Sequence, residues 1–196
     1  MPGDVAVPEL PEVETTRRGV EPLLRDQRVQ AVAVHDRRLR QPVASNLDAV
    51  LVGQTLQAVR RRAKYLLFDF SHGTLIVHLG MSGSLRVVKA SQPRLPHDHV
   101  EIDFGAGGCL RFRDPRRFGL VLWTTEQPTQ HPLLEHLGPE PFADDFDAYY
   151  LHRRARGRKV AVKNFIMDNH VVVGVGNIYA SEALFRAGVH PNRAAG

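Results

Sequence analysis

The sequence predicts an α+β protein, with a β-rich N-terminal part followed by a helical part. Between Leu56 and Thr124, short apolar segments alternate with glycine-containing turns, which is typical of a sandwich or barrel-like pair of sheets. An amphipathic helix is expected ahead of the strands, from about Leu10 to Leu24, because its apolar residues recur on one helical face. After Pro141 the strand pattern stops and helical segments follow. We therefore expect a β-sandwich-like domain with flanking helices and then a helical domain.

The predicted elements of the β-rich part follow one another closely. Alternating apolar residues predict the first strand over Val29–Val34, and a short helix is expected over Asn46–Val52. Turns at 71–73 and 105–108 separate some of the later strands. These strands are predicted over Leu56–Phe70, Thr74–His78, Ser84–Lys89, Val100–Phe104, Leu110–Arg113 and Leu120–Thr124.

The helical part is predicted to begin near Pro141, so that residues 8–140 form one domain and residues 141–196 a second. A short helix over Pro132–Leu137, ended by glycine and proline, leads to this boundary. The helices beyond it are predicted over Asp144–Arg156, Lys159–Asp168 and Asn177–Ala187.

Composition excludes several classes of protein. With 196 residues, 43% of them hydrophobic, the chain is long enough for one large domain or two small ones. A single cysteine, Cys109, excludes an internal disulfide framework and fits a reducing cytoplasm. No apolar run reaches membrane-spanning length, and the first residues lack a signal-peptide pattern. We expect a monomeric, cytoplasmic protein with no membrane partner.

The basic residues gather in four clusters, although the net charge is only +5 and the pI is near 9.8. Any single cluster is more often a solvated face than a binding site. Four clusters at so modest a net charge favour a track for nucleic acid. The clusters lie within Arg37–Arg40, Arg60–Lys64, Arg111–Arg117 and Arg153–Lys163.

The stretch Pro8–Thr15 allows two interpretations. In the first it is only the start of a helix, since Pro11 suits a first helical position and Glu12 and Glu14 suit the positive end of the helix dipole. In the second, Glu9 is a functional carboxylate beside a proline, and a proline at a true chain start carries a free secondary amine.

Lys64 lies in the apolar segment Ala63–Phe68, which is predicted to be part of a strand. Strand alternation places Lys64 on the face of Arg62, so a solvated lysine is one alternative. The other is a partly desolvated amine directed at a phosphate or a proton-transfer step.

Two loops present apolar side chains in unusual surroundings. Met81 lies between glycines at a strand end, either as core filler or as an apolar wedge that enters a base stack. The Asp114–Pro115 turn directs a loop outward that carries two guanidiniums and Phe118. Because an exposed phenylalanine beside arginine is costly for solubility alone, we favour a functional role for this loop.

Two further patterns carry weaker signals. The turn Gly174–Asn177 opens a helix whose backbone N–H groups suit a phosphate, but a lone Gly-x-Gly without a βα pattern is weak evidence of a dinucleotide site. The run His97–His99 contains two histidines and an aspartate. With one cysteine and no second cluster, it does not support a zinc site.

Five motifs occur in order along the chain: Pro8–Thr15, Arg61–Leu67, His78–Leu85, Asp114–Gly119 and Gly174–Glu182. As a set they resemble the formamidopyrimidine-DNA glycosylase family, the bacterial repair enzymes that remove 8-oxoguanine and ring-opened purines. Any one motif could match by chance, whereas the set is highly specific. Leu10 and the 116–118 loop separate this branch from the related endonuclease VIII type, whose opening reads Pro-Glu-Gly-Pro-Glu.

The resemblance implies a base-excision-repair DNA glycosylase and AP lyase that acts on oxidised purines in damaged double-stranded DNA. Pro8 would attack the sugar C1′ through its α-amine, and Glu9 would be the general acid and base. Lys64 would serve the β-elimination step and hold a phosphate.

The resemblance also implies which residues contact DNA. Met81, Arg116 and Phe118 would fill the gap left by the flipped nucleotide, with Arg116 facing the widowed cytosine. The last two predicted helices and their turn would form a helix–two-turn–helix element. The residues expected to bind DNA are His97, Arg116, Arg117, Arg158 and Asn177.

Amine chemistry supports a proline nucleophile. Attack on C1′ needs an unprotonated amine, and an α-amine with a pKa of about 7.7–8.0 is neutral in on the order of a tenth of molecules at pH 7. A lysine at about 10.4 is neutral in on the order of a thousandth or less. A secondary amine also gives an iminium that permits strand cleavage by elimination.

The sequence departs from the family at both ends. The family has a methionine directly before this proline and removes it, whereas Val7 stands here. We therefore expect residues 1–7 to be a non-native extension and the mature chain to begin at Pro8. The family continues into a C-terminal zinc finger with four cysteines, so residues 141–196 would be an incomplete domain, with no metal and no cofactor in this chain. The alternative to an enzyme is a catalytically silent fragment that binds damaged DNA.

Overall fold

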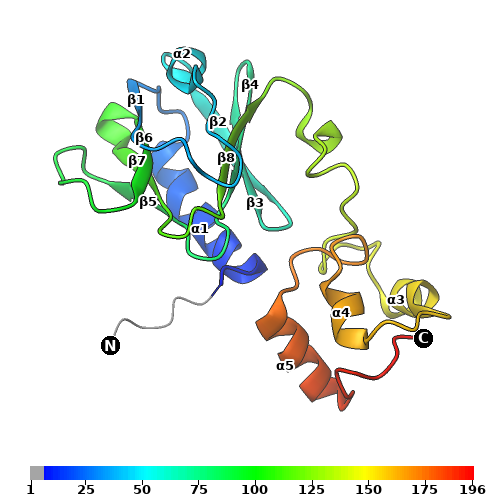
Figure 1. Cartoon of the computed structure of the whole chain (residues 1–196). Helices are drawn as coiled ribbons and strands as arrows, with labels where there is room; N and C mark the ends of the chain where they lie inside the picture. The colour runs from blue at the N-terminus through cyan, green and yellow to red at the C-terminus, as the bar shows by residue number, and fades with distance from the viewer. Residues whose placement is uncertain (1–6) are drawn as a thin grey trace. The chain divides into compact units, whose positions relative to one another are not determined.

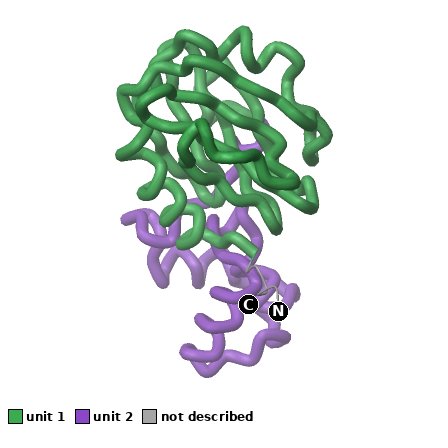
Figure 2. The backbone as a smooth tube through the Cα atoms, turned by 90° about the vertical axis from the view of Figure 1, so that its left-hand side faces the viewer, with its two compact units in different colours: residues 1–131 green, residues 132–196 purple. Residues whose placement is uncertain are grey.

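The computed structural model describes residues 7–196, so that residues 1–6, most of the predicted extension, lie outside the described residues. The chain divides into two compact units, residues 1–131 and 132–196, coloured green and purple in Figure 2. The domain boundary predicted from the sequence lies shortly after this division. The first unit is β-rich and the second is helical, which confirms the predicted α+β class.

Unit 1 contains two four-stranded antiparallel sheets (Figure 1). One has the strand order β1-β6-β7-β5 and the other has the order β2-β3-β4-β8. The strands of the first sheet are β1 (Ala31–Val34), β6 (Asp98–Asp103), β7 (Cys109–Arg113) and β5 (Ser84–Val88). Those of the second are β2 (Leu56–Arg62), β3 (Tyr65–Phe70), β4 (Gly73–His78) and β8 (Leu120–Thr124).

Helix α1 (Leu10–Leu24) contacts β2 and β3 of one sheet and β5 of the other. A proline in its first turn and Glu12 near the positive end of its dipole favour its start at the predicted residue. Its apolar face, including Val13, Val20 and Leu24, is buried in the core of unit 1. The short helix α2 (Leu47–Leu51) contacts β1.

The core of unit 1 is made by side chains from both sheets and α1. Four successive residues of β4 are buried, so this central strand is covered on both faces. Among the largest fully buried side chains are Phe68, Phe104, Phe112, Leu24, Leu56, Leu66 and Leu75. This core fixes the ends of the strands, where the predicted site residues lie.

The single strand predicted over Leu56–Phe70 is wrong, because the segment forms two strands joined at Ala63–Lys64. Ala63 adopts a left-handed backbone with φ of 53°, which is unusual for a residue other than glycine, asparagine or aspartate. The turn has neither glycine nor proline, so no residue signals a turn at this position. As a result, Lys64 lies in a turn and not within a strand.

The other predicted strands and the short helix differ from the observed ones by at most two residues at each end. The described residues of unit 1 also form two 3₁₀ turns, η1 (Gly105–Gly107) and η2 (Pro128–Gln130). None of the helices in residues 7–196 is both long and apolar enough to cross a membrane.

Unit 2 contains α3 (Ala148–Ala155), α4 (Val162–Met167) and α5 (Asn177–Ala187). The helix predicted from Asp144 begins later, because Asp147 is its N-cap and accepts a hydrogen bond from the Tyr150 N–H at 2.6 Å. The helix α4 is also shorter than predicted, whereas α5 has the predicted bounds. Gly188, with φ of 65°, ends α5.

The helix predicted over Pro132–Leu137 is wrong, since residues 132–136 form turns. So short a segment gains too few hydrogen bonds to offset the cost of helix nucleation. Instead, the backbone is fixed from outside: the Gly138 N–H donates to the Asn169 carbonyl at 2.7 Å. Within unit 2, one buried cluster contains Phe165, Val171 and Val172 with partly buried neighbours.

Candidate active site and nucleic-acid interface

Pro8 and Glu9 lie directly before α1, and both are buried; Glu9 is only 2% exposed. Glu9 is the N-cap of the helix. Its backbone N–H donates to Glu12 Oε2 at 3.0 Å, and its carbonyl accepts from the Val13 N–H at 3.1 Å. These bonds fix the backbone at the point where Pro8 joins the helix.

Lys64 lies close enough to this helix start to feel its charges. Burial lowers the pKa of the Lys64 ammonium, while the nearby carboxylates of Glu9 and Glu12 act in the opposite direction. The structure therefore brings together Glu9 and Lys64, which are far apart in sequence. A partly desolvated amine beside a buried carboxylate can hold and move protons.

The turn that carries Lys64 is tied to α1 through Arg61. One nitrogen of this guanidinium, Nη1, donates to the Ala63 carbonyl at 2.9 Å, and Nε donates to Glu14 Oε2 at 3.2 Å. Glu14 also accepts from Arg17, which is the main cause of a Glu14 pKa lowered to about 2. Glu14 and Arg17 were not predicted as supporting residues, although their i,i+3 spacing in a helix signals an ion pair.

His78 is a further residue that the sequence did not single out. Its Nδ1 accepts a hydrogen bond from the Gly80 N–H at 2.9 Å. Burial, with Arg40 and Lys64 nearby, lowers its pKa to about 4. At neutral pH the imidazole is therefore uncharged, with the proton on Nε2. No sequence pattern around His78 indicates this burial.

Met81 and Phe118 are both exposed in unit 1, at 38% and 46%. The Arg116 guanidinium carbon lies 5.0 Å from the centroid of the Phe118 ring, a cation–π contact. Exposed apolar side chains with a stacked guanidinium can contact both bases and phosphates. The geometry is consistent with the wedge role predicted for these three residues.

The two other predicted DNA-binding residues of unit 1 differ in their surroundings. His97 is exposed and has a left-handed backbone, with φ of 71°. Arg117 forms an ion pair with Asp36, with Nη2 and Oδ2 2.7 Å apart. Part of the positive charge expected for DNA is thus already neutralised inside the protein.

The predicted DNA-binding residues of unit 2 are Arg158 and Asn177, and both are exposed. Asn177 is the first residue of α5, where helix N–H groups favour an anion. The neighbouring basic run is partly engaged elsewhere: Arg153 lies over the Tyr149 ring, and Arg154 Nη2 donates to the His170 carbonyl at 3.1 Å.

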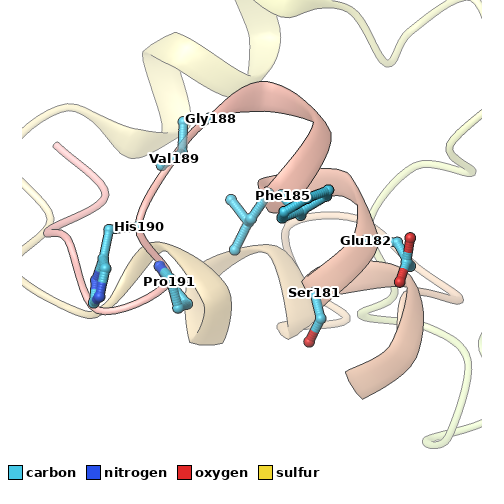
Figure 3. A pocket seen from close by; sticks show the side chains of 8 residues that line it. Ser181, Glu182, Phe185, Gly188, Val189, His190 and Pro191 are labelled. Atoms are coloured by element: carbon cyan, nitrogen blue, oxygen red, sulfur yellow. The ribbon is translucent and has the colours of Figure 1, made fainter.

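Unit 2 also has a cavity of about 680 Å³ beside α5 (Figure 3). Leu184, Phe185, Val189 and Pro191 give it an apolar lining, with Glu182 and His190 at its edges. None of the predicted site residues lines this cavity.

Within the described range, 7–196, no cluster of three or more His, Cys, Asp or Glu side chains could hold a metal ion. Cys109 is buried in β7, where burial raises the pKa of its thiol. This donor set does not fit a four-cysteine zinc site.

Two family models match the chain. The formamidopyrimidine-DNA glycosylase N-terminal domain matches residues 7–121, and the formamidopyrimidine-DNA glycosylase H2TH domain matches residues 137–196. The chain belongs to the formamidopyrimidine-DNA glycosylase family. The family recognised from the sequence is thereby confirmed, together with its class of enzyme, a DNA glycosylase of base-excision repair.

The similar proteins are longer than this chain. Formamidopyrimidine-DNA glycosylase from Syntrophotalea carbinolica is 62% identical over 190 residues, which are 97% of this chain and 70% of the relative. The enzyme from Stutzerimonas stutzeri is 63% identical over the same shares.

Solved structures give the same result. The glycosylase of Lactococcus lactis, bound non-covalently to DNA containing an AP site, is 34% identical, with a TM-score of 0.89 over 96% of this chain and 73% of that one. The same enzyme with DNA containing N7-benzyl-Fapy-dG has a TM-score of 0.88 at 34% identity over 96% of this chain and 70% of that one.

Proposed function

We propose that Pro8, Glu9 and Lys64 form the catalytic group of a glycosylase and AP lyase that removes 8-oxoguanine and formamidopyrimidines from damaged duplex DNA. One observation carries this proposal. The buried carboxylate of Glu9, which directly follows Pro8, and the partly desolvated amine of Lys64 interact electrostatically. Such environments are typical of groups that transfer protons.

In the first step, the neutral Pro8 nitrogen attacks C1′, and the bond from C1′ to the base breaks. The base leaves with the bonding electrons and takes up a proton, and Glu9 handles this proton and those of the sugar. Ring opening then leaves an iminium between the proline nitrogen and C1′.

In the second step, the iminium acidifies the C2′ proton, and its removal expels the 3′ phosphate in a β-elimination. Lys64 serves this step and holds a phosphate. A lowered pKa makes the Lys64 amine a better proton acceptor near neutral pH than an exposed lysine.

Before either step the damaged nucleotide must leave the stack, which costs roughly a few kcal/mol. Met81, Arg116 and Phe118 fill the gap and partly offset this cost. His97, Arg117, Arg158 and Asn177 hold the DNA backbone. The Lactococcus lactis relatives, solved with DNA containing an abasic site or a Fapy lesion, support a damaged-DNA partner.

We also propose that the protein acts as a monomer on duplex DNA in the bacterial cytoplasm, at the nucleoid, and that this chain itself carries no zinc. One buried cysteine supports the second statement. Metal analysis of the purified chain tests it, and stoichiometric zinc would contradict it.

The nucleophile requires a chain that begins at Pro8, because an amide nitrogen has no available lone pair. The family-model match over residues 7–121 includes Pro8 and Glu9. Intact-mass measurement of the native protein tests it, and a mass that includes Met1–Val7 would contradict it.

Borohydride trapping on an abasic duplex tests the chemistry. Two forms of the chain are compared, one that begins at Pro8 and one that retains Met1–Val7. We expect a covalent adduct only with the first form, since only that form has a free amine. Equal trapping of both forms would show that another amine, for example that of Lys64, is the nucleophile.

A second candidate is a silent protein that binds damaged DNA, favoured by the amide bond that joins Val7 to Pro8 in the sequence as written. Preference for the abasic duplex without any adduct from either form would identify this function.

A further inference from the structure

Asp114 is the most highly connected polar residue of the loops described above. Its side chain is completely buried. Oδ1 accepts a hydrogen bond from the Ser82 hydroxyl at 2.7 Å, and Oδ2 accepts one from the Gly119 N–H at 2.8 Å. The carboxylate therefore joins the loop that carries Met81 to the loop that carries Phe118.

The backbone of Asp114 extends these connections to the His97 segment. Its N–H donates to the His97 carbonyl at 3.1 Å, and its carbonyl lies 2.8 Å from His99 Nε2. Ser82 adds another bond, because its hydroxyl oxygen accepts from the Arg116 N–H at 3.1 Å. The three loop segments that carry Met81, His97 and Phe118 thus meet at Ser82 and Asp114.

The two loops are also packed backbone to backbone. A Cβ placed on Gly80, whose φ is 64°, would lie 2.6 Å from the Phe118 carbonyl carbon and 2.6 Å from the Gly119 nitrogen. A Cβ on Gly119 would lie 2.7 Å from the His78 carbonyl oxygen. Neither loop can shift without displacing the other.

We infer that Ser82 and Asp114 are positioning residues that hold Met81, Arg116, Phe118 and His97 in one fixed arrangement toward DNA. This inference rests on the proposed function, since it assigns a purpose to the exposed side chains named there. Neither residue touches the reacting atoms.

The arrangement explains how exposed side chains can act as a wedge. A side chain that inserts into a base stack must resist the restacking of the bases, so its backbone has to be held from behind. Hydrogen bonds to a buried carboxylate are short and strong, and loss of one partner leaves a buried charge unsatisfied. The hydrogen-bonded group of Ser82 and Asp114, here called the polar junction, therefore transmits displacement of one loop to the other.

The test compares Ser82→Ala with Ser82→Thr, which retains the hydroxyl, and with Ser84→Ala as a control in β5 that has no assigned role. Affinity is measured by fluorescence anisotropy for an abasic duplex and for the matching intact duplex. Thermal unfolding of each variant is recorded in the same buffer. Hydrogen exchange of the Arg116 and Gly119 amides provides a readout without DNA.

Ser82→Ala is expected to lower the ratio of abasic to intact affinity about tenfold, the equivalent of one hydrogen bond. Exchange of the Arg116 and Gly119 amides should accelerate together, although only Arg116 bonds to Ser82. Ser82→Thr should restore most of the ratio, and Ser84→Ala should match the wild type.

An unchanged ratio, or equal loss of both affinities with a lowered unfolding temperature, would overturn the inference. Acceleration at Arg116 alone would also overturn it, since the loops would then be independent. Failure of the proposed function has a different signature: the wild-type chain beginning at Pro8 would form no borohydride adduct, while the exchange and binding results would still report on the junction.

Discussion

Of the residues proposed for the chemistry, Pro8 and Glu9 are buried and Lys64 is partly buried. Those proposed to fill the DNA stack are exposed, although both groups lie in unit 1. Glu9 is 2% exposed and burial lowers the pKa of Lys64. Met81 and Phe118, in contrast, are 38% and 46% exposed. The same unit therefore supplies two different environments.

Each environment suits its task. Proton transfer by Lys64 is favoured because burial lowers the pKa of its ammonium, and buried groups need little access of their own once a nucleotide is extruded. A wedge must be exposed before DNA arrives, and exposure of apolar side chains is unfavourable in water. Both groups share one feature, which is a backbone fixed by hydrogen bonds from the protein interior.

The largest effect is expected at the buried group, for Glu9→Gln. Loss of the titratable carboxyl should slow base release by about 10²–10⁴-fold, the usual contribution of general acid–base catalysis. Binding of lesion-containing duplex should remain close to wild type, because the side chain is buried. Single-turnover excision and anisotropy titration measure the two quantities.

Glu126→Gln is the matched control, since Glu126 is an exposed carboxylate of unit 1 with no assigned role. A comparable loss of catalysis and binding in Glu9→Gln would show that Glu9 supports the fold of the site and not its chemistry.

At the exposed group the expected effect is smaller and falls on binding. Met81→Ala or Phe118→Ala should each lower affinity for an abasic duplex about 5- to 100-fold, which corresponds to the loss of one stacking contact. The β-elimination rate at saturating DNA should change little. The exposed Phe142→Ala variant, in unit 2, controls for loss of a surface aromatic. A fall in the elimination rate with unchanged affinity would contradict the division between the two groups.

The sequence predicted the two environments unequally. Glu9 and Met81 belong to motifs whose residues are contiguous, so that their roles followed from a resemblance. The turn at Ala63–Lys64 was missed because its left-handed backbone is carried by alanine, which is not a turn signal. What fixes this turn is the bond from Arg61 to the Ala63 carbonyl and the ion pair to Glu14, which are tertiary contacts.

The polar junction was also beyond sequence reasoning. Ser82 and Asp114 are separated by three strands of one sheet, β5, β6 and β7. In the sequence, an aspartate whose carboxylate is buried and hydrogen-bonded looks the same as any exposed loop aspartate. The short helix predicted at 132–137 is wrong for a related reason, because a glycine–proline stop after a short segment does not show whether one helical turn is stabilised by packing.

His78 is connected to both groups of residues. The nearby charge of Lys64, from the chemical group, helps to lower its pKa, and its Nδ1 accepts a hydrogen bond from the Gly80 N–H in the loop that carries Met81. Burial is the main cause that lowers its pKa to about 4, with Arg40 and Lys64 adding to it and Asp114 opposing it. An unfolded histidine titrates near 6.5, so the unfolded chain binds more protons between these values. Stability from this residue is therefore full above about pH 6.5 and is lost as the pH falls toward 4.

Between pH 7 and pH 5 the expected loss of unfolding free energy from His78 is about 2 kcal/mol. Urea unfolding followed by Trp123 fluorescence, which reports on β8 of unit 1, measures it in the wild type and in His78→Asn. The asparagine oxygen can still accept from the Gly80 N–H but does not titrate. Glu14, with a pKa of about 2, does not contribute in this window. An equal pH dependence in both proteins would contradict the buried, neutral histidine.

The smallest expected effect is on the salt dependence of DNA binding, and it distinguishes two arginines that were both predicted from the sequence to bind DNA. Arg117 is ion-paired to Asp36, whereas Arg158 is exposed in the segment between α3 and α4. A cation that neutralises a phosphate contributes about 0.9 to the slope of log affinity against log salt. Arg158→Ala should therefore flatten the slope by about 0.9. Arg117→Ala should flatten it by less, because Asp36, which also pairs with Arg38, already balances part of the charge of Arg117. Anisotropy titrations from roughly 50 to 200 mM salt measure both slopes.

A wild-type affinity that does not change with salt would contradict a basic track for DNA. Equal changes in the two variants would show instead that Arg117 exchanges Asp36 for a phosphate on binding, which would make this ion pair part of the DNA interface.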